Sequence, residues 1–131
     1  MEGLTLEDFQ RQVSGLLLRH RSLMDVLSKH VQSAASVNRA VTKAVTECGC
    51  IELHARRQDF RSDLGIEELK LKLDHHISGS LCENCRDVLK FELGRQFFYM
   101  SALANLLDIR LDDVLEQESK KCATLGIFNM T

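Results

Sequence analysis

Two glutamates of this chain lie in a local pattern that can support metal chemistry. Glu47-Cys48-Gly49-Cys50 and Glu92-Leu93-Gly94-Arg95 each read as Glu, any residue, Gly and then a functional side chain. In a helix, positions i and i+3 lie on one face. Two acids so placed on each of two facing helices would hold Mg²⁺, which prefers oxygen ligands. Here a thiol and a cation stand at the second positions, so each segment keeps one acid.

Four of the five cysteines form two close pairs that can bind a softer metal. Cys48-Gly-Cys50 and Cys82-Glu-Asn-Cys85 are separated by 31 residues, and two such pairs can supply the four thiolates of a tetrahedral Zn²⁺ site. Cys48 and Cys50 are about 200° apart on an ideal helix. Both can therefore face one ion only if the helix ends there, and Gly49 is a suitable residue for such an end. Two alternatives stay open: Cys48 as a buried thiol of an apolar stripe, and Cys82 with Cys85 as a redox pair at the start of a helix.

Two further groups of residues are candidates for chemistry. Glu47, Cys50 and His54 occupy positions i, i+3 and i+7 of a predicted helix, and thiolate and imidazole ligands suit Zn²⁺ or Fe²⁺. The alternative is a polar helix edge with a solvated His54. Lys120 and Lys121 stand near the end of the last predicted helix, where they can contact substrate phosphates or complement the dipole of the helix C-terminus.

The elements that must position these residues are predicted to be helices. The chain contains no proline, a residue that helix interiors tolerate badly. Apolar residues recur at helical spacing, and we predict helices over residues 5–32, 33 or 36 to 56, 66–76, 82–107 and 111–125. Thr5 can cap the first helix and Gly126 can end the last. We therefore predict one all-α domain over residues 1–131, a bundle of four to five helices.

The composition limits the partners of this bundle. Apolar residues make up 44% of the chain and the formal net charge is −2, which disfavours a nucleic-acid binder because such proteins normally carry a basic excess. No apolar run approaches the roughly 18 residues that cross a membrane, and the acidic N-terminus does not read as a secretory signal. We expect a cytoplasmic protein without a membrane or nucleic-acid partner. The segment 82–107 is apolar on several faces, which favours a homodimer that covers one of them.

The C-terminal third of the chain carries four consecutive segments: Glu92-Leu93-Gly94, Phe97-Phe98-Tyr99, Ala102-Leu103-Ala104-Asn105-Leu106-Leu107-Asp108-Ile109 and Leu111-Asp112-Asp113-Val114-Leu115. In this order they resemble a known enzyme superfamily, the MazG-like all-α nucleoside triphosphate pyrophosphohydrolases. The third core helix of that family typically reads Glu-Leu-Gly-Asp, then aromatic and apolar residues, then Ala-Asn and a turn into the final helix. The resemblance is good over residues 86–126 and weaker over 37–58, where the family's Glu-x-x-Glu motif falls on Glu47 to Cys50.

This resemblance implies a MazG-like fold and hydrolysis of a nucleoside triphosphate to the monophosphate and pyrophosphate with Mg²⁺. Of the family's four metal-binding acids, Glu47 and Glu92 match as catalytic residues, whereas Cys50 and Arg95 replace the other two. In a divergent enzyme, Cys50 and His54 would assist the two acids in binding metal, and Arg95, Lys120 and Lys121 would bind the nucleotide. The alternative is a non-catalytic, dimeric binding or regulatory module that keeps the helical fold and holds Zn²⁺ through its thiolates.

Overall fold

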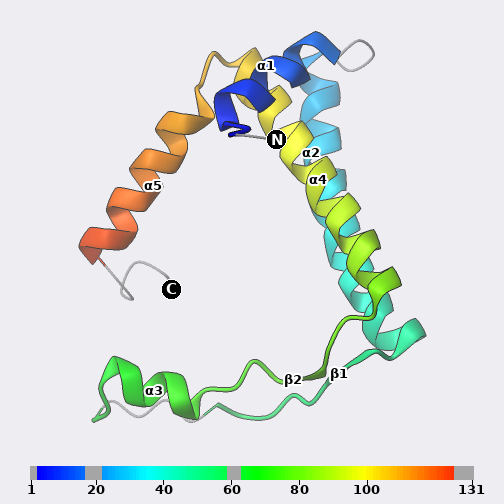
Figure 1. Cartoon of the computed structure of the whole chain (residues 1–131), viewed down its shortest axis with the longest axis vertical. Coiled ribbons are helices and arrows are strands. Elements are labelled where there is room, and N and C mark those ends of the chain that lie inside the picture. The colour runs from blue at the N-terminus through cyan, green and yellow to red at the C-terminus, as the bar shows by residue number, and fades with distance from the viewer. Residues whose placement is uncertain (1–2, 17–21, 59–62, 126–131) are drawn as a thin grey trace. The chain divides into compact units, whose positions relative to one another are not determined.

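The computed structural model describes residues 3–16, 22–58 and 63–125 of the chain, and these residues are mostly helical (Figure 1). The expected all-α class is confirmed in this coarse sense, although a small two-stranded sheet was not expected. The elements in chain order are α1 (Leu6–Leu16), α2 (Leu23–Lys43), the π-helical turn η1 (Ala44–Cys48), β1 (Ile51–Leu53), α3 (Ile66–Lys72), β2 (Ile77–Gly79), α4 (Glu83–Leu106) and α5 (Leu111–Leu125). In the described ranges, no helix combines the length and apolarity that crossing a membrane requires.

Local capping explains where several helices begin and end. The backbone amide of Asp8 donates to the Thr5 hydroxyl at 3.1 Å, which confirms Thr5 as the cap of α1. At the end of α4, Asp108 adopts a left-handed conformation with φ of 56°. This turn lets the Ile109 amide donate to the Ala104 carbonyl at 2.8 Å, and so satisfies one of the last carbonyls of the helix.

The predicted boundary between the first two helices is wrong. A break was expected at Ser33 or Ser36, but α2 is continuous from Leu23 to Lys43. The Ser33 side chain is fully buried, and its hydroxyl donates to the His30 carbonyl at 2.8 Å within the same helix. A serine that bonds its own helix in this way need not end it.

The chain divides into two compact units, which are described separately. Unit 1 comprises residues 1–36 and 92–131, and unit 2 comprises residues 37–91. In unit 1, the fully buried side chains of Val13, Val26 and Ala102 bring α1, α2 and α4 together. The partly buried side chains packed against them are Phe9, Phe98 and Leu103.

In unit 1, the buried side chain of Gln10 in α1 forms hydrogen bonds with the end of α4 and with the connection between α4 and α5. The Gln10 side-chain amide donates to the Asn105 side chain at 3.1 Å and to the Ile109 carbonyl at 3.0 Å, and its oxygen accepts from the Leu111 amide at 2.8 Å. The Asn105 side chain in turn donates to the Gln10 carbonyl at 2.9 Å. Because Gln10 is 9% exposed, these bonds replace water that the polar groups would otherwise need.

In unit 2, β1 and β2 pair in antiparallel fashion (Figure 1), with Ile51 opposite Gly79 and Leu53 opposite Ile77. The pairing continues beyond the strands, where the His54 amide donates to the His76 carbonyl at 2.8 Å. Residues 51–81 are hereafter called the hairpin segment. Its two strands have three residues each, so the pairing alone stabilises it weakly.

Side-chain bonds to Asp74 hold the outer part of the hairpin segment. Arg56 pairs with the Asp74 carboxylate at 3.1 Å, and the His76 amide donates to the same carboxylate at 3.0 Å. The Gln58 side chain bonds both backbone groups of Asp74. The His76 amide is the main reason that the pKa of Asp74 lies below its usual value, and Arg56 lowers it further.

Candidate metal centre

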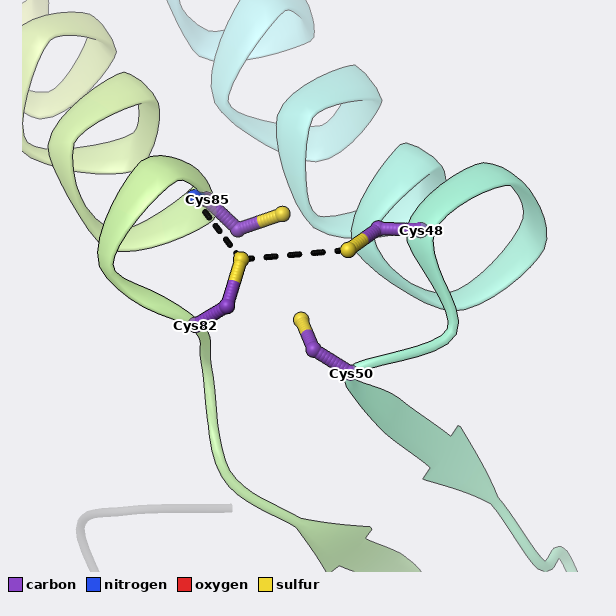
Figure 2. A group of neighbouring side chains, drawn as sticks. All are labelled: Cys48, Cys50, Cys82 and Cys85. Atoms are coloured by element: carbon purple, nitrogen blue, oxygen red, sulfur yellow. Dashed lines mark hydrogen bonds between the residues drawn. The ribbon is translucent and has the colours of Figure 1, made fainter.

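Four cysteine side chains of unit 2 converge at the base of the hairpin segment. The sulfur atoms of Cys48, Cys50, Cys82 and Cys85 all lie within 4.8 Å of one another, and these residues are called the cysteine cluster (Figure 2). Cys48 and Cys50 come from the end of η1, and Cys82 and Cys85 from the start of α4. The two sequence pairs are therefore brought together, and their four thiols can hold one metal ion.

The spacing of the sulfur atoms fits a tetrahedral site. The sulfurs of Cys48 and Cys82 are 3.8 Å apart. In a tetrahedron with metal–sulfur bonds of about 2.3 Å, the ligand atoms are about 3.8 Å apart. A disulfide bond requires about 2.0 Å, and all four residues are free cysteines. The cluster thus has the dimensions of a metal site.

The end of η1 solves the geometric problem of the Cys-Gly-Cys pair. Gly49 has φ of 77°, a left-handed conformation that L side chains rarely adopt, and its amide donates to the Ala44 carbonyl at 2.8 Å. The helix therefore ends between the two cysteines, as the sequence allowed. Cys48 belongs to the last helical turn and Cys50 lies beyond it, so the two sulfurs are no longer separated by helical rotation and face the same point (Figure 2).

The start of α4 positions the Cys-x-x-Cys pair. The Cys85 amide donates to the Cys82 sulfur at 3.3 Å, and the Arg86 amide donates to the Cys82 carbonyl at 2.9 Å. Cys82 thus occupies the capping position of α4, with sulfur in place of the usual side-chain oxygen. Anionic sulfur is favoured there because the free amides of a helix N-terminus carry partial positive charge.

The pKa values of Cys82 and Cys85 are shifted in opposite directions within the cluster. The bond from the Cys85 amide, together with the Cys85 thiol, lowers the pKa of Cys82 to about 7. The hydrogen bond between the two thiols raises the pKa of Cys85 to about 12, because Cys85 must keep its proton to donate to Cys82, and burial raises it further. A divalent cation removes this difference, since a thiol that coordinates a metal is deprotonated outright.

The backbone of Gly79 lies close to the backbone of Cys50, beside the cysteine cluster. A side-chain carbon at Gly79 would lie 2.6 Å from the Cys50 carbonyl oxygen, and Gly79 has φ of 83°. Both facts require glycine at this position. Gly79 therefore lets β2 pair with β1 immediately after Cys50, which fixes the base of the hairpin segment.

The other predicted ligands of unit 2 do not share a helical face. The helix expected to run to residue 56 ends at Gly49, so Glu47 lies in η1, Cys50 follows the helix and His54 follows β1. The expectation of one face is wrong because a left-handed glycine interrupts it. His54 lies 3.1 Å from the Glu52 carboxylate. A metal-binding role for Glu47 and His54 stays a prediction.

In unit 1, Glu92 and Arg95 of the segment Glu92-Leu93-Gly94-Arg95, hereafter the carboxylate motif, pair with each other. Arg95 lies 3.3 Å from the Glu92 carboxylate, whose side chain is 17% exposed, on the one face of α4 that their spacing predicts. Glu47 belongs to unit 2, so the two predicted catalytic acids are placed in separate units. The predicted phosphate contacts on α5 also have acidic neighbours: Lys120 pairs with Glu116 at 3.0 Å and Lys121 with Glu118 at 3.3 Å.

An apolar groove of about 350 Å³ lies beside the carboxylate motif in unit 1. Its lining residues are Leu4, Thr5, Leu6, Phe9, Gly94 and Phe97. Among the described residues of this lining, Thr5 is the one with a polar side chain, and its hydroxyl already accepts from the Asp8 amide. These described residues therefore present no charged group to a phosphate.

Comparisons with known proteins give no family. No family model matches this chain, and no curated protein and no solved structure matches it. The resemblance to MazG-like enzymes, the homodimer and the single-domain organisation accordingly stay predictions. Among residues with structural roles, sequence reasoning missed Gln10 and Asp74, whose polar character gave no periodic signal.

Proposed function

We propose that this chain is a non-catalytic helical module that holds one structural Zn²⁺ ion through Cys48, Cys50, Cys82 and Cys85. The observation that carries the proposal is the convergence of two remote cysteine pairs within 4.8 Å. Thiolates are soft ligands that suit Zn²⁺ and disfavour Mg²⁺. Four protein ligands also leave no position for a substrate, which is the usual distinction between a structural and a catalytic zinc site.

The location of the cluster supports a structural role. The ion would join the end of η1 to the start of α4 and so close the loop formed by the hairpin segment. The strands inside that loop are short, and the unit carries few buried apolar residues, Ala44 and Ile51 among the described ones. A small unit with so little core normally needs a cross-link or a metal for stability.

The test is metal content and spectroscopy of the purified full chain. We expect one zinc per chain, and after replacement by Co²⁺ an absorption spectrum typical of tetrahedral thiolate ligation. The Cys85→Ser variant should lose or weaken both signals. The matched control is Cys122→Ser, which removes the exposed cysteine of α5 outside the cluster. Cobalt without thiolate charge-transfer bands, or equal binding by both variants, would refute the proposal.

The alternative function is a divergent MazG-like nucleotide pyrophosphohydrolase. It is supported by the resemblance of residues 86–126 and by the placement of Glu92 and Arg95 on one face of α4. The test is release of pyrophosphate from a panel of nucleoside triphosphates with Mg²⁺ or Mn²⁺. Pyrophosphate release that Glu92→Ala abolishes would support this alternative. If the protein releases no pyrophosphate from any substrate, the alternative is excluded and the zinc-binding module stands as the proposed function.

A further inference from the structure

We propose that Cys48 is a modification site for hydroperoxides, and that Cys82 completes its oxidation to a disulfide that expels the metal. This inference rests on the proposed zinc site. It starts from an asymmetry within the cysteine cluster: Cys48 is exposed, whereas Cys50, Cys82 and Cys85 are half-buried. A small oxidant in solution therefore meets the Cys48 sulfur first.

The exposed sulfur has a partner within reach. The Cys82 sulfur lies 3.8 Å from that of Cys48, and a dashed line joins the two atoms in Figure 2. The two residues are 34 positions apart in the chain, so the pair is created by the fold and not by local sequence. A bound divalent ion would hold all four sulfurs as thiolates, so access decides which of them an oxidant reaches first, and a neighbouring thiol that can resolve the product makes the reaction reversible.

Formation of the Cys48–Cys82 disulfide requires a two-electron oxidant, and a hydroperoxide supplies it. The Cys48 thiolate attacks one peroxide oxygen; an S–O bond forms, the O–O bond breaks, and the leaving alkoxide or hydroxide takes a proton from water. Cys48 is then a sulfenic acid. The Cys82 thiolate attacks this sulfur, an S–S bond forms and hydroxide leaves. The two sulfurs together lose two electrons, which the peroxide accepts, and the metal ion keeps its charge but loses two of its four ligands.

The product would keep the hairpin segment closed. The Cys48–Cys82 disulfide joins the same two points of the backbone, the end of η1 and the residue before α4, that the ion joins. Oxidation would therefore release the metal without opening the loop, and a thiol reductant with added Zn²⁺ would restore the reduced site.

The experiment treats the zinc-loaded full chain with hydrogen peroxide at pH 7 and follows zinc release with a colorimetric indicator. Free thiols are then blocked, and disulfides are mapped by mass spectrometry of unreduced peptides. Cys122 is the internal reference, because it is exposed and lies outside the cluster. We expect Cys48 to be recovered as a disulfide before Cys122 is oxidised, because the Cys82 sulfur 3.8 Å away captures the sulfenic acid that forms on Cys48.

The expected result is zinc release that parallels formation of a Cys48–Cys82 disulfide, with Cys122→Ser behaving as the unmodified chain. A Cys82–Cys85 disulfide as the main product would overturn the inference. Zinc that stays bound while Cys122 is oxidised would overturn it as well. The mapping uses the unmodified chain, so no variant needs to fold. A protein that binds no zinc at all, by contrast, would refute the proposed function itself.

Discussion

Removal of the metal should open the hairpin segment and leave the packing of unit 1 intact. Within unit 2, the cysteine cluster joins residues 34 positions apart, whereas β1 and β2 have only three residues each and the bonds to Asp74 lie in the outer part of the hairpin segment. Loop-closure entropy for a cross-link of this length stabilises the closed form by about 3.8 kcal/mol. Loss of the ion should therefore raise the population of the open hairpin by about 600-fold.

Hydrogen exchange with the full chain measures this change directly. The reporters are the backbone amides of β1 and β2 and the His54 amide, which donates to the His76 carbonyl. With Zn²⁺ bound they should exchange slowly, and an excess of a zinc chelator should accelerate them by two to three orders of magnitude. The Leu111 amide, held by Gln10 in unit 1, is the reference and should change little.

Two variants complete the design. Cys82→Ala should give the fast exchange of the chelated protein whether or not Zn²⁺ is present, and Cys122→Ser should respond to the chelator as the unmodified chain does. Equal exchange of the hairpin amides with and without metal would refute the reasoning. An equal acceleration at Leu111 would show that the metal stabilises the whole chain and not the hairpin segment.

Three further outcomes are expected. Gly79→Ala should raise the dissociation constant for Zn²⁺ at least about tenfold in a chelator competition, because its side chain strains the base of the hairpin segment. Gly94→Ala has open space around the added carbon and should instead stabilise α4 by about 0.5–1 kcal/mol. Gln10→Ala should destabilise unit 1 by about 2–4 kcal/mol in denaturant unfolding, because it leaves buried backbone groups without partners. The control is Gln32→Ala, an exposed position where we expect a loss below about 0.5 kcal/mol. An equally small loss for Gln10→Ala would contradict the role of this network. The Asp74 carboxyl should titrate below its ordinary pKa of 3.8 by NMR. Its stabilisation of the hairpin is complete above that value and is lost as the pH falls through the lower pKa of the folded state, so a midpoint at or above 3.8 would count against the bonds described.

Local signals made part of the fold predictable. The Thr5 cap, the bounds of α4 and α5 within a residue or two, and the possible helix end at Gly49 follow from residues close together in sequence. The strands do not, because Ile51–Leu53 pairs with Ile77–Gly79 across a long loop and three residues show no clear alternation. The continuity of α2 through Ser33 was missed for a related reason, since burial and an internal hydroxyl bond override the preference of serine for helix ends.

The candidate site was predictable in its parts and not in its assembly. The two cysteine pairs are visible in the sequence, and Cys-x-x-Cys is a common half of a zinc site. Their convergence depends on the left-handed Gly49 and on the close approach at Gly79, which are properties of the folded backbone. The carboxylate motif shows the converse: Glu92 and Arg95 lie on one face as predicted, but that proximity makes them an ion pair.

The division of the chain also bears on the order in which it folds. Unit 2 is one continuous stretch inserted between the two halves of unit 1, so unit 1 cannot form until its halves meet across about 55 intervening residues. A metal ion that first joins Cys48 to Cys82 shortens this path to about 22 residues, which lowers the entropic barrier by about 0.8 kcal/mol. Zinc present during synthesis would thus accelerate the assembly of unit 1 by about fourfold.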